Sequence, residues 1–214
     1  MEYTKIPNIF IRSEVTKKLV EGKFSSPELD YLQNTKWVWT EKVDGTNIRV
    51  FWDGYRVAFG GRTDKSSIPK TLAARLADLF SGESNEELFE SMFGAKPFTL
   101  FGEGFGGRIQ GDNGYGSEDF ILFDVLSGDD LWLRREGVEG IAETLSIRAV
   151  PIVGEGTLNE AVEFIRQHPA SVLRDGELEG IVCRPAIDLL GRMGERLIVK
   201  IKCRDFVKGE NENG

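Results

Sequence analysis

Hydrophobic and polar residues alternate along residues 37–60, which read WVWTEKVDGTNIRVFWDGYRVAFG. Asp44-Gly45 and Asp53-Gly54 interrupt the alternation, and such dipeptides favour tight turns. The pattern predicts consecutive antiparallel strands in this part of the chain. Short apolar runs predict further strands at 98–103, 119–126, 179–184 and 196–202.

Apolar residues recur at helical spacing over 71–80 and 84–93. Ser84 and Glu87 have the spacing of a capping box at the start of the second helix. Thr157 and Glu160 have the same spacing and predict a helix through Arg166. Many short strands with few helices predict an α+β fold with antiparallel sheets. Because no linker interrupts the chain, a single domain is expected over residues 1–214, with residues 207–214 as a frayed tail.

The composition is that of a globular protein, with 40% hydrophobic and 29% charged residues. The sequence lacks both an apolar stretch of the ~20 residues that a membrane span requires and a secretory signal, so we expect a cytoplasmic protein without membrane contact. Cys183 and Cys203 are expected to be buried thiols. The formal net charge is −8, so any contact with nucleic acid must be local. A single histidine, His168, leaves catalysis to Lys, Asp, Glu, Arg and bound metal.

Several charged residues occur where strands begin or end. Lys42 precedes the Asp44-Gly45 turn, although a lysine in a K-x-D-G string is more often an ordinary solvated residue. Glu103 and Glu179 lie at strand ends beside glycines, which we expect to allow a ligand to approach closely. Lys200 and Lys202 alternate with apolar residues and therefore share one strand face, which suits a triphosphate. The alternative is an edge strand with a lysine-rich outer face.

Six segments resemble, in order and spacing, the motifs of the covalent nucleotidyltransferase superfamily, which comprises RNA ligases, ATP-dependent DNA ligases and mRNA capping enzymes. The RNA ligases of the phage double-strand-sealing type are the most similar. The match spans residues 37–206. The segments are EKVDGTN at 41–47, GGRT at 60–63, LFGEGFG at 100–106, FILFDV at 120–125, LEGIVCRP at 178–185 and LIVKIKCRDF at 197–206.

The resemblance implies a ligase adenylation-domain fold, with antiparallel sheets flanked by helices around a nucleotide cleft. It implies that the Lys42 amine attacks the α-phosphorus of ATP, with Lys200 and Lys202 as further catalytic residues. Nearby cations would favour the neutral amine and stabilise the transferring phosphate. Glu179 would position Mg²⁺ (or Mn²⁺), largely through water.

The same resemblance implies a set of nucleotide contacts. Phe123 would stack on adenine, Arg62 and Glu103 would hold the ribose hydroxyls, and Glu41 would read the adenine edge through its backbone. The full set of implied nucleotide-binding residues is Glu41, Asp44, Gly45, Asn47, Arg62, Glu103, Phe123, Lys200 and Lys202.

The chain ends at Gly214, soon after the last motif, so we expect no OB-fold domain. Residues 1–36 are expected to form an N-terminal extension packed on the domain. Substrate contacts are expected from the Gly-rich segment 104–118 with Arg108, and from Arg12, Lys17 and Lys18.

The sequence therefore predicts an ATP-dependent RNA ligase that transfers AMP to a 5′-phosphate and seals it to a 3′-hydroxyl. Its partners would be RNA or nicked nucleic-acid ends, and a monomer is favoured. The alternatives are a DNA ligase, a guanylyltransferase, or a non-catalytic protein that binds nucleotides or RNA ends.

Overall fold

The computed structural model describes residues 2–128 and 130–206, and they form two compact units. Unit 1 holds the described residues of 1–4 and 44–150, and unit 2 holds those of 5–43 and 151–214. The single domain over 1–214 stays a prediction, and the tail 207–214 lies outside the described residues.

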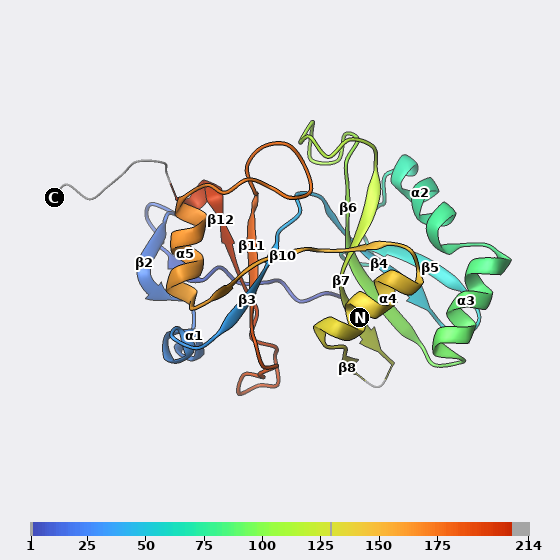
Figure 1. The fold of residues 1–214 in the computed structure, drawn as a ribbon, viewed down its shortest axis with the longest axis horizontal. Coiled ribbons are helices and arrows are strands. Elements are labelled where there is room, and N and C mark those ends of the chain that lie inside the picture. Colours follow the sequence, from blue (N-terminus) through green and yellow to red (C-terminus); the bar gives the residue numbers. More distant parts are fainter. Residues whose placement is uncertain (1, 129, 207–214) are drawn as a thin grey trace. The chain divides into compact units, whose positions relative to one another are not determined.

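Unit 1 is built on a mostly antiparallel six-stranded sheet (Figure 1). The strands follow the order β5-β4-β6-β7-β8, and the short β9 pairs in parallel with β7. Their bounds are β4 (Thr46–Trp52), β5 (Val57–Gly61), β6 (Phe98–Phe105), β7 (Asp119–Ser127), β8 (Leu131–Trp132) and β9 (Arg148–Ala149). Three helices accompany the sheet: α2 (Lys70–Phe80), α3 (Glu83–Phe93) and α4 (Arg135–Thr144).

The core of unit 1 lies between the sheet and these helices. Ile48 and Val50 on β4 face the same cluster as Leu72, Leu76 and Phe80 on α2. These side chains are all 0% exposed. The alternation that predicted β4 thus places Ile48 and Val50 toward this core, and Arg49, which lies between them in the sequence, is also buried.

Unit 2 contains a four-stranded antiparallel sheet in the order β10-β3-β11-β12. A separate hairpin of β1 and β2 and two helices complete it. The bounds are β1 (Phe10–Arg12), β2 (Leu19–Phe24), α1 (Pro27–Leu32), β3 (Trp37–Glu41), β10 (Ile152–Gly156), α5 (Leu158–Arg166), β11 (Gly180–Pro185), β12 (Val199–Lys202) and the 3₁₀ turn Cys203–Asp205.

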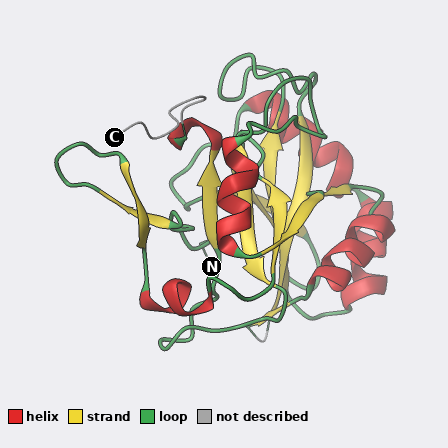
Figure 2. Cartoon of the chain, turned by 60° about the vertical axis from the view of Figure 1, so that its left-hand side comes forward, coloured by secondary structure: helices red, strands yellow, loops and turns green. Residues whose placement is uncertain are grey.

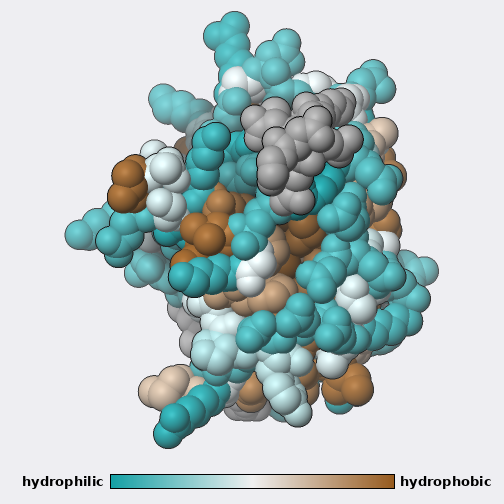
Figure 3. All heavy atoms as spheres, turned by 90° about the vertical axis from the view of Figure 1, so that its left-hand side faces the viewer, coloured by the Kyte–Doolittle hydropathy of each residue, from teal (hydrophilic) through white to brown (hydrophobic). Residues whose placement is uncertain are grey.

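Helix α5 lies along one face of the unit 2 sheet (Figure 2). It turns Leu158, Ala161, Val162 and Ile165 into a core shared with Trp37 and Ile181. The residues on its other face, Asn159, Glu160, Glu163 and Arg166, are exposed, and hydrophilic residues make up much of the molecular surface seen in Figure 3. The helix is thus amphipathic, and packing against the sheet stabilises it.

The structure confirms one of the two predicted capping boxes. Thr157 and Glu160 cap α5 reciprocally. The Ser84–Glu87 box is wrong, because α3 begins at Glu83 after Gly82. Gly82 has a φ of 97°, which lets the chain turn directly from α2 into α3 and places Ser84 inside the helix.

Residues 7–9 of the predicted N-terminal extension pair with β12. The Ile9 amide donates to the Lys200 carbonyl at 3.1 Å, and the Lys200 amide donates to the Pro7 carbonyl at 3.0 Å. Ile9 and Phe10 join the unit 2 core. Cys183 and Cys203 are both buried, as predicted.

Among the described residues, every helix is too short or too polar to cross a bilayer.

Candidate active site

Lys42 and Glu179 form a close ion pair in unit 2. The Nζ atom of Lys42 lies 2.5 Å from Oε2 of Glu179, and the Nζ atom of Lys202 lies 2.6 Å from Oε1. The three side chains are 23%, 15% and 15% exposed, respectively. One carboxylate therefore bridges two ammonium groups in a partly buried setting.

The strand register brings these residues together. Glu41 pairs with Ile181 across β3 and β11, and Gly180 pairs with Lys202 across β11 and β12. Beyond the end of β3, the Lys42 amide still donates to the Gly180 carbonyl at 2.9 Å. Lys42, the nucleophile that the family resemblance implies, thus lies beside Glu179, the carboxylate that the same resemblance assigns to the metal.

Lys200 lies on the same face of β12 as Lys202. Its pKa is lowered, first by burial and then by the charges of Lys202, Lys42 and Lys5, with Glu179 opposing the shift. Strand β12 is the last strand of its sheet, as the edge-strand alternative expects, and residues 7–9 pair with its outer side at Lys200. The lysines form a crowded cationic cluster around one carboxylate.

The glycines beside the two glutamates make room for protein atoms. A Cβ atom on Gly180 would lie 2.1 Å from the Ile201 carbonyl oxygen, and one on Gly104 would lie 2.4 Å from the Leu72 side chain. The prediction that these glycines allow a ligand to approach is therefore wrong. They allow neighbouring elements to pack closely.

Glu41 is only 1% exposed. Its carboxylate accepts hydrogen bonds from the Ser171 hydroxyl and, at 3.0 Å, from the Val172 amide. The Glu41 amide donates to the Pro151 carbonyl at 3.0 Å. Glu41 thus anchors the loop that precedes Glu179, a role that the sequence did not reveal, and its contact with adenine stays a prediction.

In unit 1, β4 and β6 place Asn47 opposite Glu103. The Asn47 Oδ1 atom is buried, and no described group hydrogen bonds to it. An acceptor in this position is costly unless a ligand or water satisfies it. The ring of Phe123 on β7 is partly buried and meets Tyr3 edge-on, with the ring centroids 5.1 Å apart.

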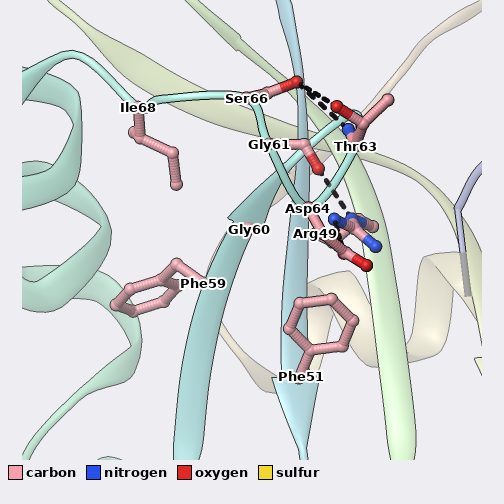
Figure 4. A pocket seen from close by; sticks show the side chains of 9 residues that line it. All are labelled: Arg49, Phe51, Phe59, Gly60, Gly61, Thr63, Asp64, Ser66 and Ile68. Carbon is pink, nitrogen blue, oxygen red and sulfur yellow. Dashed lines mark hydrogen bonds and ion pairs between the residues drawn. The ribbon is translucent and has the colours of Figure 1, made fainter.

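Arg62 is exposed in the loop that follows β5. The start of this loop borders a pocket of about 360 Å³, and Figure 4 shows Arg49 among the residues that line it. The pocket is lined by Arg49, Phe51, Phe59, Gly60, Gly61, Thr63, Asp64, Ser66 and Ile68.

The Gly-rich segment holds the turn that follows the nucleophile motif. The Asp44 amide donates to the Tyr115 hydroxyl at 3.2 Å, and Asn113 donates through Nδ2 to the Asp44 carbonyl at 2.9 Å. Gln110 donates to the Gly45 carbonyl at 3.1 Å. The sequence marked only Arg108 in this segment, and Arg108 is exposed.

The basic residues expected near the N-terminus are also exposed. Arg12 forms a two-pronged ion pair with Asp205, with both distances 2.8 Å, and Lys17 and Lys18 lie nearby in the sequence. The Arg12 guanidinium is thus already engaged by a carboxylate.

The RNA ligase family model matches residues 35–202. The chain belongs to the RNA ligase family. Solved structures of Naegleria gruberi RNA ligase have the same fold. This finding confirms the predicted α+β adenylation fold of this RNA ligase family member.

The structural likeness extends over most of the chain. A variant of the N. gruberi enzyme with ATP and Mn gives a TM-score of 0.66 at 18% identity, covering 94% of this chain and 56% of that one. The same enzyme with PPi gives 0.61 at 22% identity, covering 82% and 52%. A variant with AMP and Mn gives 0.62 at 20% identity, also covering 82% and 52%.

The RNA ligase family member described here thus spans about half the length of those solved chains. No curated protein sequence matches it significantly.

The donor set fits a sparsely ligated divalent ion. Among residues 2–128 and 130–206, no group of three or more His, Cys, Asp and Glu residues is arranged to hold a metal. Mg²⁺ keeps much of its water and often takes one or two carboxylates with substrate phosphate oxygens. Glu179 offers such a carboxylate, whose oxygens here contact Lys42 and Lys202.

Proposed function

We propose that this chain is the adenylation core of an ATP-dependent RNA ligase that forms lysyl-AMP on Lys42. The observation that carries the proposal is the bridge from Lys42 through Glu179 to Lys202, with Lys200 on the same strand face. A covalent nucleotidyltransferase needs a lysine amine, positive charge beside a phosphate and a carboxylate, and this cluster supplies all three.

In the first step, the Lys42 nitrogen forms a bond to the α-phosphorus while the bond to pyrophosphate breaks. The amine must leave its ion pair with Glu179 and lose a proton before it attacks, because an ammonium has no free electron pair. Lys200 and Lys202 would remain beside the phosphate oxygens and balance their charge. Mg²⁺ or Mn²⁺ held by Glu179 would add further positive charge there.

The nucleotide contacts implied by the family motifs belong to this proposal. The buried Oδ1 atom of Asn47 has no hydrogen-bond donor among the described residues, so a donor group of a bound nucleotide would satisfy it. Phe123 offers a partly exposed ring, and Arg62 and Glu103 offer a donor and an acceptor for ribose hydroxyls. The N. gruberi enzyme has been solved with ATP and Mn and with AMP and Mn, and we expect the same ligands to bind here.

The later steps would transfer AMP to a 5′-phosphate and join that end to a 3′-hydroxyl. The family match favours RNA ends over DNA ends. We infer that exposed Arg108 and the Gly-rich segment contribute to substrate binding. We also infer a cytoplasmic monomer, and two cysteines that are both buried suit a reducing compartment.

The test is incubation with α-phosphate-labelled ATP and Mg²⁺, followed by a denaturing gel. We expect a labelled band that Lys42→Ala abolishes. Lys36→Ala is the matched control, because Lys36 forms an exposed ion pair with Glu155. Labelling by GTP instead of ATP would indicate a guanylyltransferase, and absence of any label would leave only a nucleotide-binding protein.

Labelled protein is then offered nicked RNA, nicked DNA and single strands. Sealing of an RNA 3′-hydroxyl end supports the RNA ligase function. Sealing of DNA alone would point to a DNA ligase.

A further inference from the structure

Arg49 on β4 is a buried cation in unit 1, and its side chain is 2% exposed. Its Nε atom donates to the Gly61 carbonyl at 2.6 Å, and Nη2 lies 2.8 Å from Oδ1 of Asp64. The guanidinium carbon also lies 5.0 Å from the centre of the Phe51 ring. Burying a guanidinium is costly unless its donors are satisfied, so these partners fix its position.

The two partners flank Arg62 in the sequence. Gly61 precedes Arg62 directly, and Asp64 follows it by two residues. Figure 4 shows the Arg49 side chain reaching from its strand to both partners. The Arg49 guanidinium thus binds Gly61 and Asp64, which lie on either side of Arg62, the predicted ribose-binding residue.

Hydrogen bonds within the loop that follows β5 also hold its conformation. The Thr63 amide donates to the Ser66 hydroxyl at 3.2 Å, and the Ser66 amide donates to the Thr63 carbonyl at 3.0 Å. A Cβ atom on Gly61 would lie 2.7 Å from Ser66 Cβ. The loop is therefore folded back on itself, and Arg49 attaches it to the sheet.

We propose that Arg49 is a positioning residue that sets the place of Arg62 and thereby the selectivity of the nucleotide site for ribose. A guanidinium presents its donors in a rigid planar fork, which a lysine cannot reproduce. The inference rests on the proposed function, because Arg62 acts on ribose only if the chain binds ATP.

The experiment compares lysyl-AMP formation from ATP with the corresponding reaction from 2′-deoxyATP, as a ratio of kcat/KM values. Arg49→Lys keeps the charge but loses the fork, and we expect the ratio to fall roughly tenfold, the order expected for one hydrogen bond to a charged group. Arg56→Lys, in the exposed turn between β4 and β5, is the matched control and should leave the ratio unchanged.

Asp64→Ala is a second variant, which truncates a side chain that is 86% exposed but removes a partner of the buried guanidinium, so its fold is checked by thermal melting. It removes one of the two anchors and should lower the ratio by a smaller factor. Arg62→Ala should lower the ratio of kcat/KM values for ATP and 2′-deoxyATP at least as much as Arg49→Lys does. Adding Arg49→Lys to Arg62→Ala should then lower this ratio no further.

Each outcome bears on a separate claim. Unchanged ribose selectivity in folded Arg49→Lys and Asp64→Ala, or additive losses in the double variant, would overturn the positioning role. Failure of the wild-type protein to take label from ATP would contradict the proposed function. Thermal melting of each variant distinguishes a local change from loss of the fold.

Discussion

Glu179 holds Lys42 at 2.5 Å while its second oxygen holds Lys202 at 2.6 Å. Lys42, the proposed nucleophile, thus forms an ion pair with the residue that the family motifs assign to the metal. Two strand pairings create this relationship, because β11 lies between β3 and β12. These pairings bring Lys42, Glu179 and Lys202, which lie far apart in the sequence, into one cluster.

Glu179→Gln keeps the size of the side chain but removes its charge. The lysine cluster then lacks its counter-ion, and the divalent ion lacks its carboxylate. We expect lysyl-AMP formation to fall by ~100-fold or more, as for other losses of a charge-stabilising group. The measurement is single-turnover labelling with ATP. Glu155→Gln, which breaks the exposed pair with Lys36, should retain full activity.

The charge on Lys200 lowers the free energy of unfolding by an amount that depends on pH. Its folded-state pKa lies below the ordinary 10.5 because burial and neighbouring lysines disfavour its charge. Below the folded-state pKa, Lys200 is protonated in both the folded and the unfolded protein, and the destabilising effect is fully present. As the pH rises toward 10.5, Lys200 loses its proton first in the folded protein, and the destabilising effect decreases. Lys200→Met removes the disfavoured charge and should therefore raise Tm at pH 7.

Thermal melting from pH 7 to pH 10 checks this prediction. The advantage of the Lys200→Met variant should shrink as pH increases, while its labelling by ATP is lost. An advantage that grows with pH would contradict the assigned direction of the shift. Lys65→Met, at an exposed position of unit 1, is the control and should change Tm little at any pH.

The strands around the site could be predicted from the sequence because apolar and polar residues alternate along much of their length, and the side chains of β3 do alternate between buried and partly buried positions. Residues 37–41 of β3 and 46–52 of β4 fall within the predicted alternating segment. The face shared by Lys200 and Lys202 followed from the same periodicity. Such patterns depend only on neighbouring residues, so one sequence suffices to read them.

Contacts between distant segments could not be predicted in this way. The Glu41 carboxylate caps a loop at Ser171, and Arg49 reaches Asp64 through a fold-back loop. Helix α4 was missed, since its short sequence REGVEGIAET contains two glycines and few apolar residues. Its Val138 and Ile141 are fixed by tertiary packing, which outweighs weak helix propensity.

Tyr115 tests whether the Gly-rich segment positions the turn after Lys42. Tyr115→Phe removes the hydroxyl that accepts from the Asp44 amide but keeps the ring, whose centroid lies 5.2 Å from that of Phe105. We expect lysyl-AMP formation to slow about fivefold, the effect of one hydrogen bond worth about 1 kcal/mol. Tyr55→Phe, at a position 78% exposed, should leave the rate unchanged.

Asn113→Asp provides an independent probe of the same turn. It replaces the Nδ2 donor to the Asp44 carbonyl with a second acceptor, so the slowing should exceed that of Tyr115→Phe. Rapid quench labelling with ATP measures both variants. Equal rates for wild type and both variants would show that the segment has no part in the first step.

Gly180 is the first residue of β11, directly after Glu179, and lies opposite Lys202. A methyl group there would meet the Ile201 carbonyl oxygen at 2.1 Å and the Lys202 Cα atom at 2.8 Å. Gly180→Ala must therefore push β11 and β12 apart at the point that sets the distance from Glu179 to Lys202. We expect a loss of about 2 kcal/mol in stability, within the range for overpacking, with slower labelling by ATP.

Gly140→Ala is the matched control in α4. Nothing lies within 4 Å of its added methyl group, so the variant should gain about 0.5–1 kcal/mol from the higher helix propensity of alanine. Chemical denaturation of both variants provides the comparison. If Gly180→Ala were as stable and as active as wild type, close contact between the strands could not be what fixes the carboxylate beside its two lysines.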